Sequence, residues 1–245
     1  MDHSISCKNC GNSSSNNFCE NCGQRTSINR VTFKETFSDL KDYTFSINAP
    51  FFKTLELLFV NPGKVLREYL NGRRKSYYKP VAFFLLVTLF YLLCKFLIDF
   101  NPLPDRIKPT DAIGEYEIFS EAGYFMFANI DKILFIFVFT LGIALKGFFY
   151  KKYSLAEYIA ISFFLVGVYI LCGVVNMFAL TYISKKLSYL ALGLFLLYLT
   201  YALISLFQKK KLLVGIKSIL VYFISVFFYM VFGYGLSLLI VMLKQ

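Results

Sequence analysis

Five apolar runs, each close to the length needed to cross a lipid bilayer, dominate the sequence from Pro80 onward. They cover residues 80–98, 131–150, 157–180, 187–207 and 216–243. A membrane-spanning helix needs about 20 consecutive apolar residues, and in lipid every backbone polar group must find its partner inside the protein. The pattern therefore predicts an all-α polytopic membrane protein. The composition agrees, because 57% of the residues are hydrophobic and only 17% are charged.

The charges that flank these runs predict how the helices are oriented. Basic residues cluster before the first run, after the second and between the last two: Lys64, Arg67, Arg73, Arg74, Lys75, Lys79, Lys151, Lys152, Lys209, Lys210, Lys211 and Lys217. The segment 99–131 instead holds seven acidic residues against two basic ones. Because basic loops stay in the cytoplasm, we expect a cytoplasmic N-terminus and an external C-terminus. Lys185 and Lys186 are the exception, since this topology places them outside.

The first 30 residues are polar and contain two cysteine pairs in the same sequence frame, CKNCG and CENCG. A segment with so few apolar side chains cannot fold around a hydrophobic core and needs a metal or a similar staple. Two facing CxxCG turns bring four sulfur atoms together, which is the ligand set of a structural zinc ribbon. The sequence therefore predicts a Zn²⁺ site made by Cys7, Cys10, Cys19 and Cys22.

Other uses of these cysteines are weaker explanations of the pattern. Disulfides are rare in the cytoplasm, where the topology places this segment. A redox-active CxxC pair does not explain two copies in one frame, whereas a shared metal does. Iron also accepts four sulfur ligands, so the identity of the metal stays open between zinc and iron.

Residues 31–79 are amphipathic and join the ribbon (1–30) to the membrane part (80–245). The periodicity predicts helices lying in the membrane interface, one at 33–41 and one starting at Pro50, then a turn at Asn61–Gly63 and a short helix that ends near Gly72. A basic, tyrosine-rich stretch, REYLNGRRKSYYKP, follows at residues 67–80 and is called the collar below. We expect the collar to contact anionic lipid or a protein partner through Arg67, Arg73, Arg74, Lys75, Tyr77, Tyr78 and Lys79.

The CxxCG…FCxxCGQ ribbon followed by NPGKVLREYLNGRRKSYYKP before the first span resembles a bacterial family of uncharacterised zinc-ribbon membrane proteins, a domain of unknown function. The resemblance covers about residues 7–100. It implies the architecture and location in the bacterial cytoplasmic membrane, and it implies no activity.

Few ionisable residues fall inside the predicted spans. Lys95 lies four residues before Asp99, so we expect it to pair with that residue or to reach the membrane surface. Glu157 and Asn176 are the other polar positions of interest. The spans contain no histidine and the chain has no HExxH, GxSxG or P-loop pattern, which argues against an enzyme.

Two functions remain as expectations. The first is a membrane-embedded adaptor or accessory subunit that presents the ribbon to a protein partner. The alternative is a transporter or channel component formed by the helix bundle, particularly as an oligomer. The ribbon carries few basic residues, so its charge does not favour nucleic acid as a partner.

Overall fold

The structure is a computed structural model, and it describes residues 5–28, 30–34, 49–101, 115–208 and 210–244. The predicted interfacial helix at 33–41 lies almost wholly outside these ranges. In chain order the elements are β1 (Ile5–Ser6), β2 (Ser13–Ser14), α2 (Ala49–Val60), α3 (Pro62–Leu70), α4 (Pro80–Leu97), α5 (Glu115–Ala128), α6 (Ile130–Phe148), α7 (Leu155–Tyr182), the 3₁₀ turn η2 (Lys185–Leu187), α8 (Leu190–Phe207) and α9 (Lys211–Met242).

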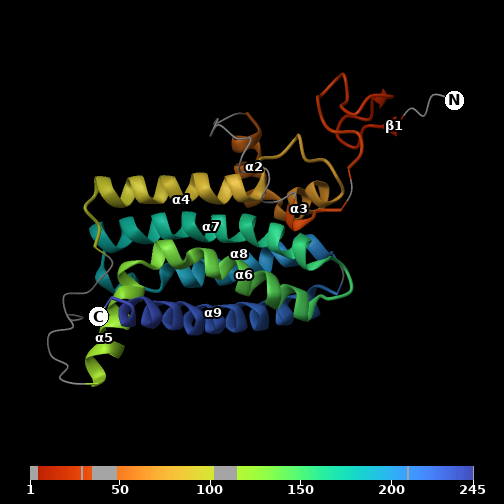
Figure 1. Cartoon of the computed structure of the whole chain (residues 1–245). Helices are drawn as coiled ribbons and strands as arrows, with labels where there is room; N and C mark the ends of the chain where they lie inside the picture. The colour runs from red at the N-terminus through yellow and green to blue at the C-terminus, as the bar shows by residue number, and fades with distance from the viewer. Residues whose placement is uncertain (1–4, 29, 35–48, 102–114, 209, 245) are drawn as a thin grey trace.

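The membrane part is a bundle of long apolar helices (Figure 1). Four helices, α4, α7, α8 and α9, are long and apolar enough to cross a membrane, and a fifth crossing is made if α5 and α6 count as one bent span. The predicted runs thus correspond to helices, with ends that differ by a few residues. At a rise of 1.5 Å per residue, the 32-residue α9 is about 48 Å long, which exceeds the hydrocarbon core.

The two faces of α9 differ in the way expected of a helix between lipid and protein. Phe223, Phe227 and Val231 follow one another at helical spacing and are exposed. The opposite face buries small residues, including Ser225 and Gly233. A Cβ atom at Gly233 would lie 3.0 Å from Met126 of α5, so a small residue here permits close helix packing, as is common in membrane bundles.

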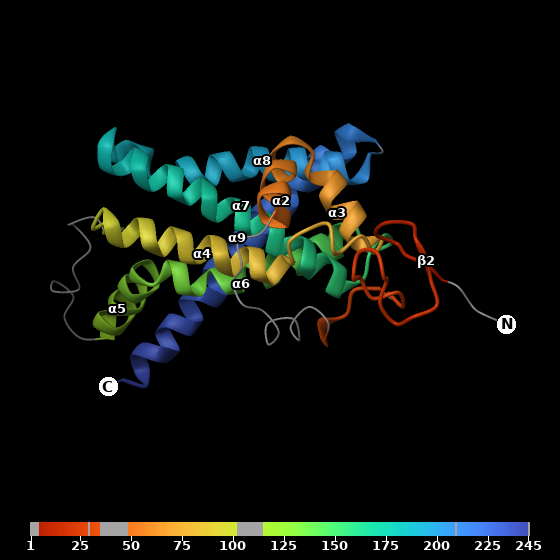
Figure 2. The same ribbon diagram turned by 90° about the horizontal axis from the view of Figure 1, so that it is seen from above.

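Helix α7 runs beside α8 (Figure 2), packs against α4 and α6 as well, and is the most buried of the four helices long enough to cross a membrane. Its aromatic side chains interlock with those of its neighbours. The rings of Phe163 and Phe84 meet edge to face at 5.5 Å, and Phe164 lies 5.6 Å from Tyr69 of α3. The last contact joins the membrane core to the segment that precedes it.

Helix α5 was not predicted from the sequence. The segment 99–131 was expected to be an acidic loop, but residues 115–128 are helical and run up to the start of α6 at an angle of 84°. The acidic residues of this segment led to the prediction of a loop, although the other residues of the helix are mostly apolar. Ala122 and Met126 are buried, and Tyr234 of α9 donates a hydrogen bond to the Phe119 carbonyl at 3.1 Å.

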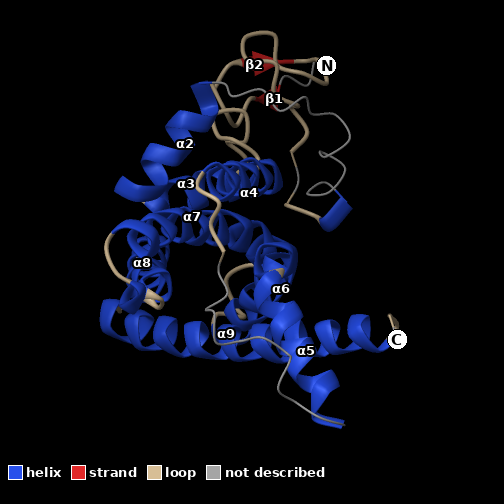
Figure 3. Cartoon of the chain, turned by 90° about the vertical axis from the view of Figure 1, so that its left-hand side faces the viewer, coloured by secondary structure: helices blue, strands red, loops and turns tan. Residues whose placement is uncertain are grey.

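Helices α2 and α3 form a corner at Asn61 that packs on α8 (Figure 3). Asn61 caps α3 by accepting a hydrogen bond from the Lys64 amide, and Pro62 opens the helix, so the turn predicted at Asn61–Gly63 is the start of α3. Two tyrosines of α8 satisfy the last carbonyls of α2: Tyr198 donates to Leu58 at 3.1 Å and Tyr201 to Val60 at 2.5 Å.

The N-terminus of α3 approaches α8 so closely that only glycine fits at position 63. The Gly63 amide donates to the Ser205 hydroxyl at 3.2 Å. One turn further along α3, the Arg67 guanidinium donates to the carbonyls of Ser205 and Leu206. These carbonyls belong to the last turn of α8, where backbone acceptors have no partner within the helix and a cation is favoured.

Candidate metal centre

The four ribbon cysteines sit on two turns of matching construction. In the first turn the Gly11 amide donates to the Cys7 carbonyl at 2.8 Å, and in the second the Gly23 amide donates to the Cys19 carbonyl at 2.7 Å. Both glycines have positive φ angles, 78° and 66°, a conformation that other residues adopt only with strain. The glycine of each CxxCG motif is therefore required by the turn.

The sulfur atoms of the four cysteines converge on one point. Cys7 and Cys22 lie 3.6 Å apart, Cys10 and Cys19 lie 3.5 Å apart, and all four ligand atoms lie within 4.8 Å of one another. A tetrahedral site with metal–sulfur bonds of about 2.3 Å has sulfur–sulfur edges of about 3.8 Å. The cluster therefore fits a metal ion held by four thiolates.

The ribbon environment treats the thiols differently. The backbone amide of Cys22 makes the largest contribution in lowering the pKa of Cys19 to about 7, whereas burial raises the pKa of Cys22 to about 11. Because a metal binds thiolates, loading the site releases thiol protons and is favoured as pH rises.

Gln24, the residue after the second turn, fastens the ribbon to the collar. Its side chain is buried at 5% exposure. Its amide nitrogen donates to the Gly72 carbonyl at 3.0 Å, and its amide oxygen accepts from the backbone amides of Arg74 and Lys75 at 3.1 and 3.0 Å. One side chain thus satisfies three backbone groups of the collar, and these three hydrogen bonds are called the Gln24 clamp below.

A second contact joins the first cysteine turn to the collar. Ser76 donates a hydrogen bond of 2.7 Å to the side chain of Asn9, which lies between Cys7 and Cys10. Gly72 has a φ angle of 105°, and a Cβ atom there would lie 2.8 Å from the Lys8 side chain. Both halves of the ribbon are therefore held against the collar.

Tyr77 and Tyr78, two of the three collar tyrosines, are buried, so the structure does not expose them for the predicted contact with lipid or a partner. Tyr77 is 3% exposed and donates to Glu68 at 2.7 Å. Tyr78 is 7% exposed, its ring meets Phe51 edge to face at 5.4 Å, and its backbone amide donates to Thr54 at 2.8 Å. A tyrosine near the end of a span can lie at the membrane interface or be buried in the protein, and here contacts with α2 and α3 bury both side chains.

The basic residues of the collar fall into two groups. Arg67 is engaged with α8, as described above, and Arg73 pairs with Glu68 at 3.3 Å. Although burial acts to raise it, the Tyr77 hydroxyl and the Arg73 guanidinium hold the pKa of Glu68 below its ordinary value. Arg74 lies over the ring of Tyr69 at 5.9 Å. Lys75 is exposed and Lys79 half-buried, so their contact with lipid or a partner stays a prediction.

Replacing Gln24 with alanine is expected to release the ribbon from the collar without loss of metal. Each collar backbone group left without a partner costs about 1–3 kcal/mol, so hydrogen exchange at the Arg74 and Lys75 amides should accelerate about 10- to 100-fold. Hydrogen–deuterium exchange with mass spectrometry measures this. Asn17→Ala, on the exposed loop between the cysteine pairs, is the control. Unchanged exchange in Gln24→Ala would show that the clamp does not hold the ribbon.

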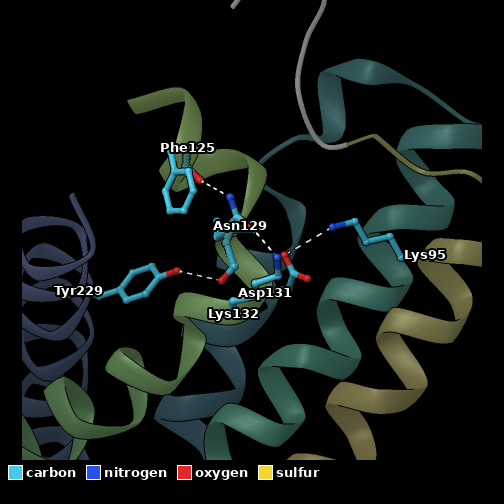
Figure 4. A network of polar contacts seen from close by, with 7 residues as sticks. Lys95, Phe125, Asn129, Asp131, Lys132 and Tyr229 are labelled. Carbon is cyan, nitrogen blue, oxygen red and sulfur yellow. Dashed lines mark hydrogen bonds and ion pairs between the residues drawn. The ribbon is translucent and has the colours of Figure 1, made fainter. Parts of the chain in front are cut away.

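Sequence reasoning also missed an ion pair inside the bundle, shown in Figure 4. The Lys95 ammonium of α4 lies 3.4 Å from Asp131 at the start of α6, with side chains 21% and 5% exposed. Lys95 was expected to pair with Asp99, four residues later, or to reach the membrane surface. The position of Asp131 at the edge of an apolar run was the available signal, but the partner could come only from the fold.

The bend between α5 and α6 places further polar groups beside this pair (Figure 4). The Asn129 amide donates to the Phe125 carbonyl at 2.9 Å and its oxygen accepts from Lys132 at 2.8 Å. The Tyr229 hydroxyl of α9 lies 3.5 Å from the Ile130 carbonyl. These contacts satisfy backbone and side-chain groups that the break in the helix leaves open.

Glu157 and Asn176, the other polar residues singled out in the sequence, do not form a common site in the structure. Glu157 is buried in a capping box, in which its carboxylate accepts from the Ser154 amide at 2.7 Å and its own amide donates to the Ser154 hydroxyl. Asn176 lies on α7, and its side-chain oxygen has no hydrogen-bond partner among the described residues. Glu157 thus has a structural role at the start of α7.

Comparison with known proteins finds a family match for part of the chain. Residues 49–92 match a family described as a protein of unknown function (DUF3667). The match spans α2, α3, the collar and most of α4, and it does not include the ribbon. No curated protein and no solved structure matches the chain. The segment 49–92 is therefore similar to a family of unknown function, which confirms in part the resemblance seen in the sequence.

Proposed function

We propose that the protein is a membrane-embedded adaptor or accessory subunit that presents a zinc ribbon to a protein partner. The observation that best supports this proposal is the Gln24 clamp, which holds the ribbon in one place on the helix bundle. A ribbon that recruits a partner binds it more tightly when it is held in place, because a pre-organised surface loses less conformational entropy on binding.

The chemistry of the metal centre supports a structural role. Four cysteines complete a tetrahedral shell and leave no open position for a substrate or a water molecule. Zinc suits this shell, and a closed shell of this kind holds the ribbon together rather than taking part in a reaction. Phe18 is 56% exposed on the same ribbon and lies under Arg25, with the guanidinium 5.9 Å from the ring centroid. Exposed aromatic and arginine side chains are typical anchors of protein interfaces.

The proposed location is the bacterial cytoplasmic membrane with the ribbon inside the cell. The end of the bundle where α4 begins, called the ribbon end below, carries the ribbon, the collar, Lys152 and Lys210, and α5 and the C-terminus lie at the other end (Figure 1). This charge distribution favours a cytoplasmic ribbon end. Five crossings would then place the C-terminus outside.

The test compares three full-length proteins purified in mild detergent: wild type, Phe18→Ala and the double variant Cys19→Ser/Cys22→Ser. We expect one zinc ion per chain in the wild type and in Phe18→Ala, and none in the double variant. A defined partner should co-purify with the wild type and be lost in both variants. Iron in place of zinc would correct the metal assignment. A partner that is retained by both variants would exclude the ribbon as the recruiting surface.

One observation favours a transporter or channel component as a second candidate function. An ion pair inside a membrane bundle, placed at a sharply bent helix pair, is the arrangement that transport sites often use. Ion or substrate flux in proteoliposomes that depends on Asp131 and not on Phe18 would support this candidate over the adaptor.

A further inference from the structure

A cavity of about 580 Å³ opens at the ribbon end of the bundle, away from the metal centre. It lies between the turn that joins α6 to α7 and the turn that joins α8 to α9. Its apolar lining comes from Phe149, Phe207, Leu213 and Val214. Its volume falls in the range of small-molecule binding sites, about 300–1,000 Å³.

Two stacked aromatic rings make the floor of this cavity. Phe149 follows the last residue of α6 and Phe207 is the last residue of α8. Their ring centroids lie 4.2 Å apart with an interplanar angle of 13°. The stack joins two helix ends in one apolar cluster that lines the cavity, and its ring edges offer apolar contact to a hydrocarbon chain.

Three lysines form the rim: Lys152, Lys210 and Lys217. The Lys152 ammonium lies 5.1 Å from the Phe207 ring centroid, and that of Lys217 lies 5.5 Å from Phe149 and donates to the Phe148 carbonyl at 3.1 Å. No acidic residue of the described chain lines this cavity. Each ammonium has three donors, so the rim can bind an anion above the aromatic floor.

The cavity opens beside the lipid-facing surface of α9. Leu212 and Ile216, which flank it on the first turns of that helix, are 81% and 52% exposed. A chain that leaves the cavity along α9 would therefore continue over apolar side chains. A soluble anion such as phosphate would use the rim and leave both the floor and this surface without contact.

We propose that this cavity binds one anionic phospholipid, with its phosphate between Lys152, Lys210 and Lys217 and the start of an acyl chain against Phe149 and Phe207. Basic pockets between helices on the cytoplasmic side of a membrane are suited to anionic headgroups. No described residue of the ribbon (1–30) lines this cavity.

A second cavity, of about 440 Å³, extends the positive surface toward the ribbon. Lys152 lines both cavities, and the charged residues that line the second with it are Lys8, Arg30 and Glu157. The Glu157 carboxylate also accepts a hydrogen bond from the Ser154 amide in its capping box. A bound headgroup would thus lie next to the base of the ribbon.

The test measures lipid binding to the full chain after delipidation, using vesicles of phosphatidylcholine that contain one-fifth phosphatidylglycerol, and native mass spectrometry of the re-extracted protein. Lys210→Gln/Lys217→Gln keeps side-chain size and removes two charges. At about 1 kcal/mol per lysine, the affinity for phosphatidylglycerol should fall about 30-fold. Lys185→Gln/Lys186→Gln removes the same charge at the other end of the bundle and should change little.

A second variant separates a built site from general surface charge. Leu213→Trp, at a half-exposed position, fills the apolar part of the cavity and leaves the three lysines in place. It should also lower the affinity for phosphatidylglycerol. Full binding by Leu213→Trp, an equal loss in the Lys185/Lys186 control, or equal retention of phosphatidylcholine would each overturn the proposal. Competition by soluble glycerophosphoglycerol as strong as that by the lipid would assign the site to a free phosphate ester instead.

Discussion

Lys95→Met is expected to destabilise the bundle by about 3–5 kcal/mol, because it leaves the Asp131 carboxylate buried without its partner. Asp131 is only 5% exposed and begins α6, next to the bend with α5. The reverse variant, Asp131→Asn, should cost less. Lys95 lies in the last turn of α4 and is 21% exposed, so its ammonium can reach the membrane surface along a flexible stem.

The double variant Lys95→Met/Asp131→Asn tests the interaction between the two side chains more directly, because it gives their coupling energy. If the two side chains interact as Figure 4 shows, the double variant should be more stable than Lys95→Met alone, with a coupling energy of about 2 kcal/mol. Equilibrium unfolding in mixed micelles gives each free energy. Lys132→Met is the matched control, since Lys132 is exposed and adjacent and loses only an exposed hydrogen bond to Asn129, for which a loss of about 1 kcal/mol or less is expected. Equal losses in Lys95→Met and Lys132→Met would show that the ion pair contributes nothing.

Features with a local cause could be predicted from this sequence. The spans follow from the length of each apolar run, because a bilayer of fixed thickness demands helices of about that length. The cysteine turns follow from CxxCG, because spacing and glycine together set the direction of the sulfur atoms. The Asn61 cap and Pro62 likewise begin α3 through interactions within a few residues.

Features that depend on distant segments could not be predicted. Gln24 stands next to a cysteine turn but its three partners lie about 50 residues later. Lys95 has an acidic neighbour in sequence, yet its partner is Asp131 on another helix. Tyr77 has the sequence context of a membrane belt, and only the packing of the collar buries it. In each case a polar or aromatic side chain had several suitable environments, and tertiary contacts selected one.

Gly63→Ala is expected to disrupt the corner that carries the collar, with a loss of about 3 kcal/mol or more. A Cβ atom at position 63 would lie 2.2 Å from the Ser205 carbonyl oxygen and 2.3 Å from its carbon. These are backbone atoms inside α8, so they cannot move aside as a flexible side chain would. Helix α3 must shift instead, and alanine's better helix propensity cannot offset that clash.

Gly193→Ala, on the same helix α8, is the matched control and should have the opposite sign. No atom lies within 4 Å of a Cβ placed at Gly193, so alanine there should stabilise the protein by about 0.5–1 kcal/mol. Thermal unfolding of both variants in detergent measures the difference. A neutral effect of Gly63→Ala would mean that α3 and α8 are not in the close contact described.

Gly63→Ala also tests whether the packing of α3 on α8 is coupled to the position of the ribbon on the collar. A shift of α3 would pull Arg67 from the Ser205 and Leu206 carbonyls. It would also move Gly72, which lies two residues after the end of α3 and whose carbonyl accepts a hydrogen bond from Gln24. Gly63→Ala should therefore accelerate hydrogen exchange at the Arg74 and Lys75 amides while the four cysteines keep their metal. Unchanged exchange at these amides in a destabilised variant would show that the ribbon is held by the collar alone, independently of how α3 packs on α8.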